Sequence, residues 1–384
     1  MLLASSWLLF LLLLYTVAVL LVQGAAVYLA ALMPGLGPDD AGPTGRPRVS
    51  AIIAARNEEE DLGPCLDSLL AQDYPNLEVI VVDGGSNDRT VAVARARGDR
   101  VRVIPEPPLP PGWVGKNWAC SLGATAATGE LLLFTDADMR YHSRVLSATL
   151  GWAEREGADM VTLAPRVEAV GFWERVVLPF YTQMVLTYFR APRMNRPGSR
   201  AALANGQYWL VRRSVYEAIG GHSAVRGYVL EDIALARLLR DRGATMRIAW
   251  APELLSTRMY RTRDEMFEGI LKNIHGTRFS LARQLGITGG LLLFFLAPLA
   301  VLPLGLAFGS LTWAAFGTLL LGVLLAKHVG FAAGVRERAV YGLLFPLAVG
   351  FYLAVLARSI AGGLAGRPLR WKGREYPLDP SDVG

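Results

Sequence analysis

The sequence predicts an α/β protein with a mixed, mainly parallel sheet flanked by helices and with transmembrane helices at both ends. Two short apolar runs, Val49–Ala55 and Leu77–Asp83, are bounded by polar residues, which is typical of buried parallel strands. Between them, residues 59–72 place leucines at helical spacing, and a third buried strand is expected at Leu131–Thr135. Strands that alternate with a helix in this way indicate a parallel sheet covered by helices.

Composition separates hydrophobic ends from a charged middle. Of the 384 residues, 52% are hydrophobic, which is too many for an ordinary soluble enzyme, yet 19% are charged. The formal net charge is +6, but no Lys/Arg-rich run stands beside an aromatic platform. We therefore expect a membrane surface and a phosphate-bearing substrate as partners, and no nucleic acid. Cys65 and Cys120 lack metal-ligand spacing and are interpreted as small buried residues.

Apolar runs define the expected domains. Residues 2–32 carry no charge and exceed the ~20 residues that span a bilayer core. No Lys or Arg precedes them, so we expect a retained anchor rather than a signal peptide. The resulting division is an N-terminal anchor (1–33), a Gly/Pro-rich linker (34–47), a catalytic domain (48–286), transmembrane segments (287–363, with apolar runs at 289–308, 311–334 and 341–361) and a basic, then polar tail (364–384).

The distribution of basic residues indicates a multi-pass protein of the cytoplasmic membrane whose catalytic domain faces the cytoplasm. Four full spans would place the basic tail outside, against the positive-inside tendency. Either one segment is re-entrant or interfacial, or the tendency fails here, and both alternatives stay open. Residues 172–189 are apolar and aromatic but interrupted by Glu174, Arg175 and Pro179, which favours a helix in the membrane interface over a core helix.

The strongest chemical signal is a pair of aspartates, Asp136 and Asp138, directly after the strand residues 131–134. Two carboxylates one residue apart at a strand end repel each other. A divalent cation removes that cost and can also bridge a diphosphate. The alternative is an ordinary turn with helix-capping aspartates.

Polar residues also follow the first two predicted strands. Arg56 and Glu58 come after the first strand, and Asp83 precedes a Gly-rich turn after the second. Ligands in parallel sheets bind beyond the carboxyl ends of the strands, so these side chains are candidate ligand contacts. A carboxylate at Asp83 can accept a hydrogen bond from a uracil ring N–H, whereas simple β–α punctuation is the alternative for the turn.

Two further positions carry candidate chemistry. Lys116 follows a rigid turn of proline and glycine and leads into a helix, where a lysine can meet a phosphate or remain on the surface. Asp232, beside Glu231, precedes an expected helix at 233–239. It can cap that helix or act as a general base towards an acceptor hydroxyl.

Taken in order, these residues resemble the family 2 glycosyltransferases with a GT-A fold. The resemblance spans residues 48–280 and rests on residues 55–58, 82–88, 115–116, 136–138, 212–213 with 220–221, and 231–232. It implies an inverting hexosyltransferase that uses a nucleotide-diphosphate sugar. The implied roles are nucleotide-sugar binding for Arg56, Glu58, Asp83, Lys116 and Asp136, ligation of Mg²⁺ or Mn²⁺ for Asp138 with Asp136, and catalysis for Asp232, the acceptor-side base, with Glu231.

The chain departs from the family pattern in two places. Gly84 follows Asp83 where the family usually carries a second acidic residue. Residues 269–273 read Gly-Ile-Leu-Lys-Asn, where processive polysaccharide synthases carry Gln-x-x-Arg-Trp. We therefore expect transfer of a single sugar, with Arg258, Arg261 or Lys272 as candidate cations for the leaving diphosphate.

Residues 112–119, 258–261, 269–273 and 371–376 look like the branch of the family associated with carotenoid and hopanoid biosynthesis. This resemblance implies transfer from a UDP-hexose to a hydrophobic membrane lipid such as a terpenoid or carotenoid. The alternatives are a processive polysaccharide synthase, a non-catalytic membrane sugar-binding protein and a nucleotidyltransferase. Glu231, Asp232 and the membrane segments argue against the last of these.

Overall fold

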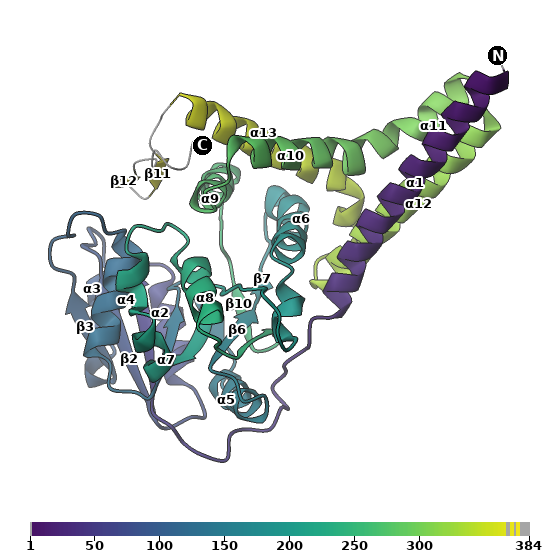
Figure 1. Cartoon of the computed structure of the whole chain (residues 1–384). Helices are drawn as coiled ribbons and strands as arrows, with labels where there is room; N and C mark the ends of the chain where they lie inside the picture. Colours follow the sequence, from purple (N-terminus) through teal and green to yellow (C-terminus); the bar gives the residue numbers. More distant parts are fainter. Residues whose placement is uncertain (1, 366–368, 372–373, 377–384) are drawn as a thin grey trace. The chain divides into compact units, whose positions relative to one another are not determined.

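The computed structural model describes residues 2–365, 369–371 and 374–376, and its elements are labelled in Figure 1. The chain forms two compact units. The first, the sheet unit, comprises Leu32–Glu168 and Phe189–Met259. The second, the helical unit, comprises Met1–Ala31, Ala169–Tyr188 and Tyr260–Gly384. The expected basic tail, 364–384, lies largely outside the described residues.

The sheet unit is built on seven strands in the order β3-β2-β1-β4-β8-β6-β9. The strands predicted from the sequence are β1, β2 and β4; β1 pairs in parallel with both of the others. β8 runs antiparallel to its neighbours β4 and β6, so the expected mixed, mainly parallel sheet is confirmed. The bounds are β1 Val49–Ala55, β2 Leu77–Asp83, β3 Val101–Pro105, β4 Leu131–Thr135, β6 Met160–Ala164, β8 Tyr208–Arg212 and β9 Met246–Trp250.

Helices flank this sheet and bury their apolar faces in its core. α2 is shorter than the predicted helix at 59–72, and its leucines Leu62, Leu66 and Leu69 are fully buried, as their spacing predicts. The helices are α2 Leu62–Leu70, α3 Thr90–Arg95, α4 Gly115–Ala126, α5 Val145–Arg155, α7 Arg213–Ala218 and α8 Glu231–Asp241, with 3-10 turns η1 Gly98–Arg100, η2 Ala191–Asn195 and η3 Gly221–Val225.

A second, small sheet has the order β5-β10-β7, with bounds Met139–Tyr141, Leu255–Thr257 and Arg166–Val167. β5 and β10 are antiparallel, and Thr257 pairs with Met139. The end of β10 is thereby placed beside the residues that follow β4.

The helical unit contains four segments that are long and apolar enough to cross a membrane. Within the described part of the chain these are Trp7–Ala31, Leu281–Ala307, Leu311–Gly334 and Ala339–Leu364. The predicted segment at 172–189 forms a helix, α6, in this same unit. The elements are α1 Leu2–Ala31, α6 Phe172–Tyr188, α9 Arg263–Gly276, α10 Leu281–Leu291, η4 Leu292–Leu296, α11 Ala297–Ala307, α12 Leu311–Gly334, η5 Ala339–Leu344, α13 Phe345–Leu364, β11 Leu369–Trp371 and β12 Arg374–Tyr376.

A proline interrupts the segment formed by α10, η4 and α11. Pro298 has no N–H. It therefore cannot donate a backbone hydrogen bond to the carbonyl of Phe294, four residues earlier, or to that of Leu293, five residues earlier. Both carbonyls instead accept hydrogen bonds from α1: Tyr15 Oη donates to Leu293 O at 2.7 Å, and Gln23 Nε2 donates to Phe294 O at 2.9 Å. Side chains of α1 therefore satisfy the backbone of a broken helix, as apolar surroundings require.

Gln23 makes a second contact inside the helical unit. Its Oε1 accepts a hydrogen bond from the ammonium of Lys327 in α12, and that ammonium also lies 4.9 Å from the ring centroid of Phe295. The helices α1, α11 and α12 lie side by side in Figure 1, and Leu12, Val301 and Leu320 share one apolar cluster. Gln23, which is 1% exposed, therefore links three segments.

We expect Gln23→Leu to lower the free energy of unfolding of the full chain in detergent by about 1–2 kcal/mol. Phe294 O loses its donor and Lys327 loses its acceptor. Chemical denaturation measures the change. Pro298→Ala restores an N–H at position 298, so Gln23→Leu should cost less in that background. An equal loss of stability from Gln23→Leu in the wild type and in Pro298→Ala would contradict the idea that Gln23 replaces the missing N–H of Pro298.

Candidate functional site

The polar residues predicted from the sequence lie at the carboxyl ends of three adjacent strands. Ala55 of β1 is in register with Asp83 of β2, and Ile53 of β1 is in register with Thr135 of β4. The residues that follow these strands, including Arg56, Glu58, Asp136 and Asp138, therefore emerge from one edge of the sheet. This is the edge at which parallel sheets bind ligands.

Asp83 orders the turn that follows β2. Its carboxylate accepts hydrogen bonds from the backbone N–H groups of Gly85, at 3.2 Å, and of Ser86, at 3.3 Å. Gly84 has little free space beside it, because a Cβ there would lie 3.3 Å from Glu106 Oε2 and 3.4 Å from Arg56 Cβ. A carboxylate from the end of β3 thus stands next to the position where the family usually carries its second acidic residue.

Lys116 joins two parts of the site that are far apart in the sequence. It lies in the first turn of α4, and its Nζ is 2.8 Å from Asp136 Oδ1 and 3.0 Å from Glu231 Oε1. Burial opposes the charge on Lys116, but the carboxylates of Asp136, Glu231 and Asp232 outweigh it and raise the pKa of the lysine well above its usual value. Lys116 is therefore held as a cation among three carboxylates.

The residue after Lys116 fixes the backbone that leads to α8. Asn117 is fully buried, and its Nδ2 lies 2.7 Å from Val225 O, 3.2 Å from Arg226 O and 3.0 Å from Tyr228 O. These carbonyls belong to the segment just before Glu231. Adjacent residues of α4 therefore hold both the approach to α8 and its first side chain.

Asp232 lies in the first turn of α8 and does not occupy the cap position, which is Leu230. Its carboxylate accepts from Gly206 N at 2.7 Å and from Ile233 N at 2.8 Å. Burial raises the pKa of Asp232 to about 7, and Glu231 adds to the rise, while Lys116 and the two backbone donors oppose it. Such a carboxylate can exchange a proton near neutral pH.

Asp138 is held by β10. Its Oδ2 accepts from Thr257 Oγ1 at 3.0 Å, and its Oδ1 is buried with no hydrogen-bond partner among the described residues. Burial raises the pKa of Asp138 to about 7, and the charges of Asp136 and Glu58 add to the rise, while the bond from Thr257 opposes it. A buried carboxylate oxygen without a donor is suited to a cation.

The three residues predicted to supply a cation for the leaving diphosphate belong to different units. Arg258 directly follows β10 and thus comes next in the chain to Thr257, which contacts Asp138. Arg261 and Lys272 belong to the helical unit: the backbone N–H of Arg261 donates to Glu265 Oε2, and Lys272 lies within α9. The roles of all three stay sequence predictions.

Several residues of the site were not predicted from the sequence, namely Asn117, Gly206, Thr257 and Glu106. Gly206 is required for a steric reason, since a Cβ there would lie 3.0 Å from both Asp232 Oδ2 and Lys116 Nζ. The dipeptide Asn205-Gly206 was a turn signal that could have drawn attention to this position. The other three carry no local pattern, because their partners lie in distant segments.

The fold belongs to the class known as GT-A. A solved structure, the mannosyltransferase PcManGT from Pyrobaculum calidifontis in complex with GDP-Man and Mn²⁺, is similar with a TM-score of 0.53 over 88% of this chain and 98% of that chain, at 20% identity. Residues 50–220 match the family described as Glycosyl transferase family 2. Residues 50–220 are therefore similar to the family 2 glycosyltransferases, as the motifs predicted.

Sequence relatives point to the expected branch of this family. A 4,4'-diaponeurosporenoate glycosyltransferase of Staphylococcus haemolyticus is 28% identical over 229 residues, which is 59% of this chain and 60% of that protein. The enzyme of the same name from Staphylococcus aureus is 27% identical over 56% of each chain. The match thus spans about 60% of the length of these curated relatives.

Proposed function

We propose that this protein is an inverting glycosyltransferase that moves one hexose from a nucleotide-diphosphate sugar, UDP-hexose, to a hydrophobic membrane lipid at the cytoplasmic face of the membrane. The observation that carries the proposal is the cluster of Lys116, Asp136, Glu231 and Asp232. It joins the strand-end aspartate expected to face the donor to the carboxylate expected to face the acceptor. A sugar-binding protein without turnover would not need a carboxylate that titrates near pH 7.

The proposed reaction is a single displacement at the anomeric carbon. Asp232 accepts the proton of the acceptor hydroxyl while the hydroxyl oxygen forms the new bond to that carbon. The bond from the carbon to the diphosphate oxygen breaks, and its electron pair leaves with the diphosphate. Attack from the opposite face inverts the anomeric centre. Glu231 keeps Lys116 in place and supports the raised pKa of Asp232.

Donor binding is assigned to the strand ends. Asp83, with the Glu106 carboxylate beside Gly84, forms an acidic region suited to ring N–H donors of the base. Arg56 Nε, which is buried and unpaired in the described structure, can donate to the nucleotide. Lys116 supplies positive charge at the sugar-diphosphate end, and Arg258 is the candidate for the leaving group within the sheet unit.

The aspartates after β4 fit a divalent cation, Mg²⁺ or Mn²⁺. No group of three or more His, Cys, Asp and Glu side chains surrounds a common point in the described part of the chain. Asp138, with its unpartnered buried oxygen, and Asp136 would hold the ion, and diphosphate oxygens and water would complete its shell. When bound, the ion would offset charge that develops on the departing diphosphate.

The hydrophobic acceptor is inferred from the helical unit and from the relatives. A lipid that left the bilayer to reach a soluble enzyme would lose about 0.8 kcal/mol per exposed CH₂. Four segments suited to span a membrane remove the need for that step. The similar staphylococcal proteins are named for a carotenoid-type acid, 4,4'-diaponeurosporenoate, which supports a terpenoid acceptor.

The decisive experiment incubates membranes that contain the protein with radiolabelled nucleotide sugars and then extracts them with organic solvent. We expect label in the organic phase, in a product that carries one sugar. Membranes with Asp232→Asn serve as the control and should give little label. Label confined to water-soluble or high-mass polymer would rule out the lipid acceptor and favour a polysaccharide synthase.

The metal assignment predicts a loss of turnover in excess chelator that Mg²⁺ or Mn²⁺ restores. Asp138→Asn should lose most turnover yet stay folded, since an asparagine oxygen can still accept from Thr257 and the substitution removes a buried charge whose other oxygen has no partner. Mn²⁺ should raise the melting temperature of the wild type but not of Asp138→Asn, because only a state that binds the ion is stabilised. Asp99→Asn, at an exposed position, is the matched control. Full activity in chelator would refute the assignment.

The assignment of Asp232 predicts that Asp232→Asn retains nucleotide-sugar binding while turnover at saturation falls by a factor on the order of 100 or more. A general base works in its deprotonated form, so wild-type kcat/KM should rise with pH up to about 7, with a drop of about tenfold per pH unit below it. A collapse of nucleotide affinity with turnover intact would assign Asp232 to the donor instead.

Two variants should shift the acidic side of the pH profile of kcat/KM, here called the acid limb, in opposite directions. Glu231→Gln removes a negative neighbour and should lower the pKa of Asp232, which moves the limb to lower pH. Lys116→Met removes a positive neighbour and should move it to higher pH. Shifts of the same sign would show that the limb belongs to another group.

A further inference from the structure

A basic segment, residues 190–200, follows α6 and takes no part in the chemistry described above. It contains four arginines, all of them exposed: Arg190, Arg193, Arg196 and Arg200. Residues 175–216 contain no Asp or Glu, so no acidic neighbour along the chain offsets this charge. None of Arg190, Arg193 and Arg200 forms an ion pair with a described residue. The segment is therefore an exposed positive surface.

Contacts with the sheet unit hold the backbone of this basic segment in place. The 3-10 turn η2 lies inside it, and Met194 is fully buried. Asn195 pairs with β9, at the edge of the sheet: its Nδ2 donates to Ile248 O at 2.9 Å, and its Oδ1 accepts from Ile248 N at 2.8 Å. Arg240 of α8 donates to Met194 O at 3.0 Å and to Ala201 O at 3.1 Å. The exposed arginines thus belong to a fixed turn and not to a loose linker.

The helix that precedes the segment ends at one end of a candidate membrane span. Tyr188, the last residue of α6, packs against Phe279, with ring centroids 4.9 Å apart. Phe279 lies two residues before the first residue of the span Leu281–Ala307. The guanidinium of Arg283, in the first turn of that span, lies 5.6 Å from the centroid of the same ring. Tyr188 is therefore located where headgroups would meet the hydrocarbon of a bilayer.

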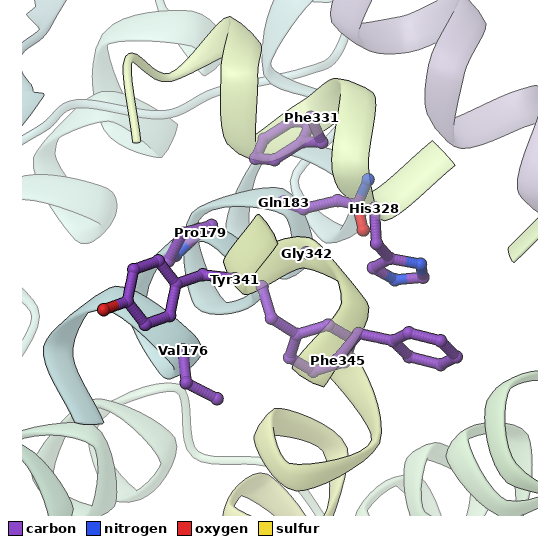
Figure 2. A pocket seen from close by; sticks show the side chains of 9 residues that line it. Val176, Pro179, Gln183, His328, Phe331, Tyr341, Gly342 and Phe345 are labelled. Atoms are coloured by element: carbon purple, nitrogen blue, oxygen red, sulfur yellow. The ribbon is translucent and has the colours of Figure 1, made fainter. Parts of the chain in front are cut away.

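Packing within the helical unit fixes α6 in this position. Figure 2 shows side chains of α6, α12, η5 and α13 around one small cavity, with Val176 and Pro179 from α6 and Tyr341 from η5 among them. The ring of Phe180 in α6 also meets that of Phe295 in η4 edge to face, with centroids 5.6 Å apart. Because η4 belongs to the span Leu281–Ala307, α6 keeps its position relative to that span.

The length of the chain then limits how far the basic segment can lie from the membrane. Arg190 follows Tyr188 by two residues, so their Cα atoms are at most ~7 Å apart. The headgroup region on each side of a bilayer is about 5–7 Å thick. Arg190 therefore begins the segment at the level of the headgroups.

We propose that residues 190–200 are a docking surface for the phosphates of anionic phospholipids. Guanidinium groups match phosphate oxygens in both charge and geometry. The field of an anionic leaflet extends over about a Debye length, ~8 Å at physiological salt, which is the range within which Arg190 is tied to the membrane. The proposal goes beyond the proposed function, since docking needs no sugar transfer.

Docking of this segment also has a consequence for the sheet unit. Six residues after Arg200 the chain reaches Gly206, whose N–H donates to Asp232. Arg240, which holds the segment at Met194 and Ala201, lies in the same helix as Asp232. A segment bound to headgroups would therefore set the height of Asp232 above the membrane.

The test measures docking of the full chain in lipid nanodiscs, without nucleotide sugar. Cys65 and Cys120 are buried, so Ser199→Cys provides one accessible thiol for a fluorophore within the segment. The nanodiscs contain phosphatidylcholine with a nitroxide on its headgroup, with or without phosphatidylglycerol. We expect the nitroxide to quench the fluorophore at least about twofold more when phosphatidylglycerol is present. High salt should remove this excess quenching, because exposed charges are screened.

Two triple variants, both with Ser199→Cys, remove the same charge from different places. The first replaces arginines of the segment: Arg190→Gln, Arg193→Gln and Arg200→Gln. The matched control replaces three exposed arginines elsewhere in the sheet unit: Arg46→Gln, Arg95→Gln and Arg100→Gln. The first variant should lose the excess quenching, and the control should retain it.

Three results would overturn the proposal. Equal quenching with and without phosphatidylglycerol would show that the segment does not recognise anionic headgroups. The same loss in both triple variants would assign the effect to net charge. Excess quenching that UDP abolishes would assign the arginines to the diphosphate of the donor.

The outcome is separable from that of the proposed function. Excess quenching that depends on the arginines of the segment, in a protein that labels no organic-phase product, would retain the docking surface and reject the transferase activity. Organic-phase product together with equal quenching in the two lipid compositions would do the reverse.

Discussion

The contact of Lys116 with Asp136 and Glu231 is the interaction on which the site depends. Without it, the strand-end aspartate after β4 and the acidic start of α8 would repel each other, because carboxylates that face one another in a partly buried place destabilise the folded state. One ammonium offsets only part of this charge. The site is therefore assembled yet still negative, which is the electrostatic condition in which a further cation and its bound diphosphate stabilise it.

Asn117 and Gly206 help to keep Lys116 and its carboxylate partners in this arrangement. Asn117 ties the backbone before Glu231 to α4, so the lysine and its partner move as one structure. Gly206 lets its own N–H reach Asp232, which no larger residue would allow without displacing the carboxylate or Lys116. Burial keeps the pKa of this carboxylate raised although the backbone donors that hold it oppose the rise, and a raised pKa is the property that a base requires near neutral pH.

The extent to which the sequence predicted these features depends on how local their signals are. β1, β2 and β4 were predicted with their observed bounds because continuous apolar runs mark strands buried on both faces. The strand-end residues Asp83, Asp136 and Asp138 followed from adjacency to those runs. β8, antiparallel between β4 and β6, was not predicted, since pairing direction is set by the path of the chain and not by the strand itself. Thr257 and Asn117 were missed for a similar reason, as each acts on a residue more than 100 positions away.

The helical unit shows how buried polar groups are accommodated in an apolar setting. The two carbonyls to which Pro298 cannot donate accept hydrogen bonds from Tyr15 and Gln23. Gln23 also accepts a hydrogen bond from Lys327, so these polar groups are buried together with their partners. Other buried polar atoms of this unit have no hydrogen-bond partner among the described residues, namely those of Thr16, Gln183, Gln284, His328 and Ser359. In the sheet unit, one of the buried atoms without a partner among the described residues is a carboxylate oxygen of Asp138, and a negatively charged oxygen beside a second aspartate is suited to a cation rather than to a neutral donor.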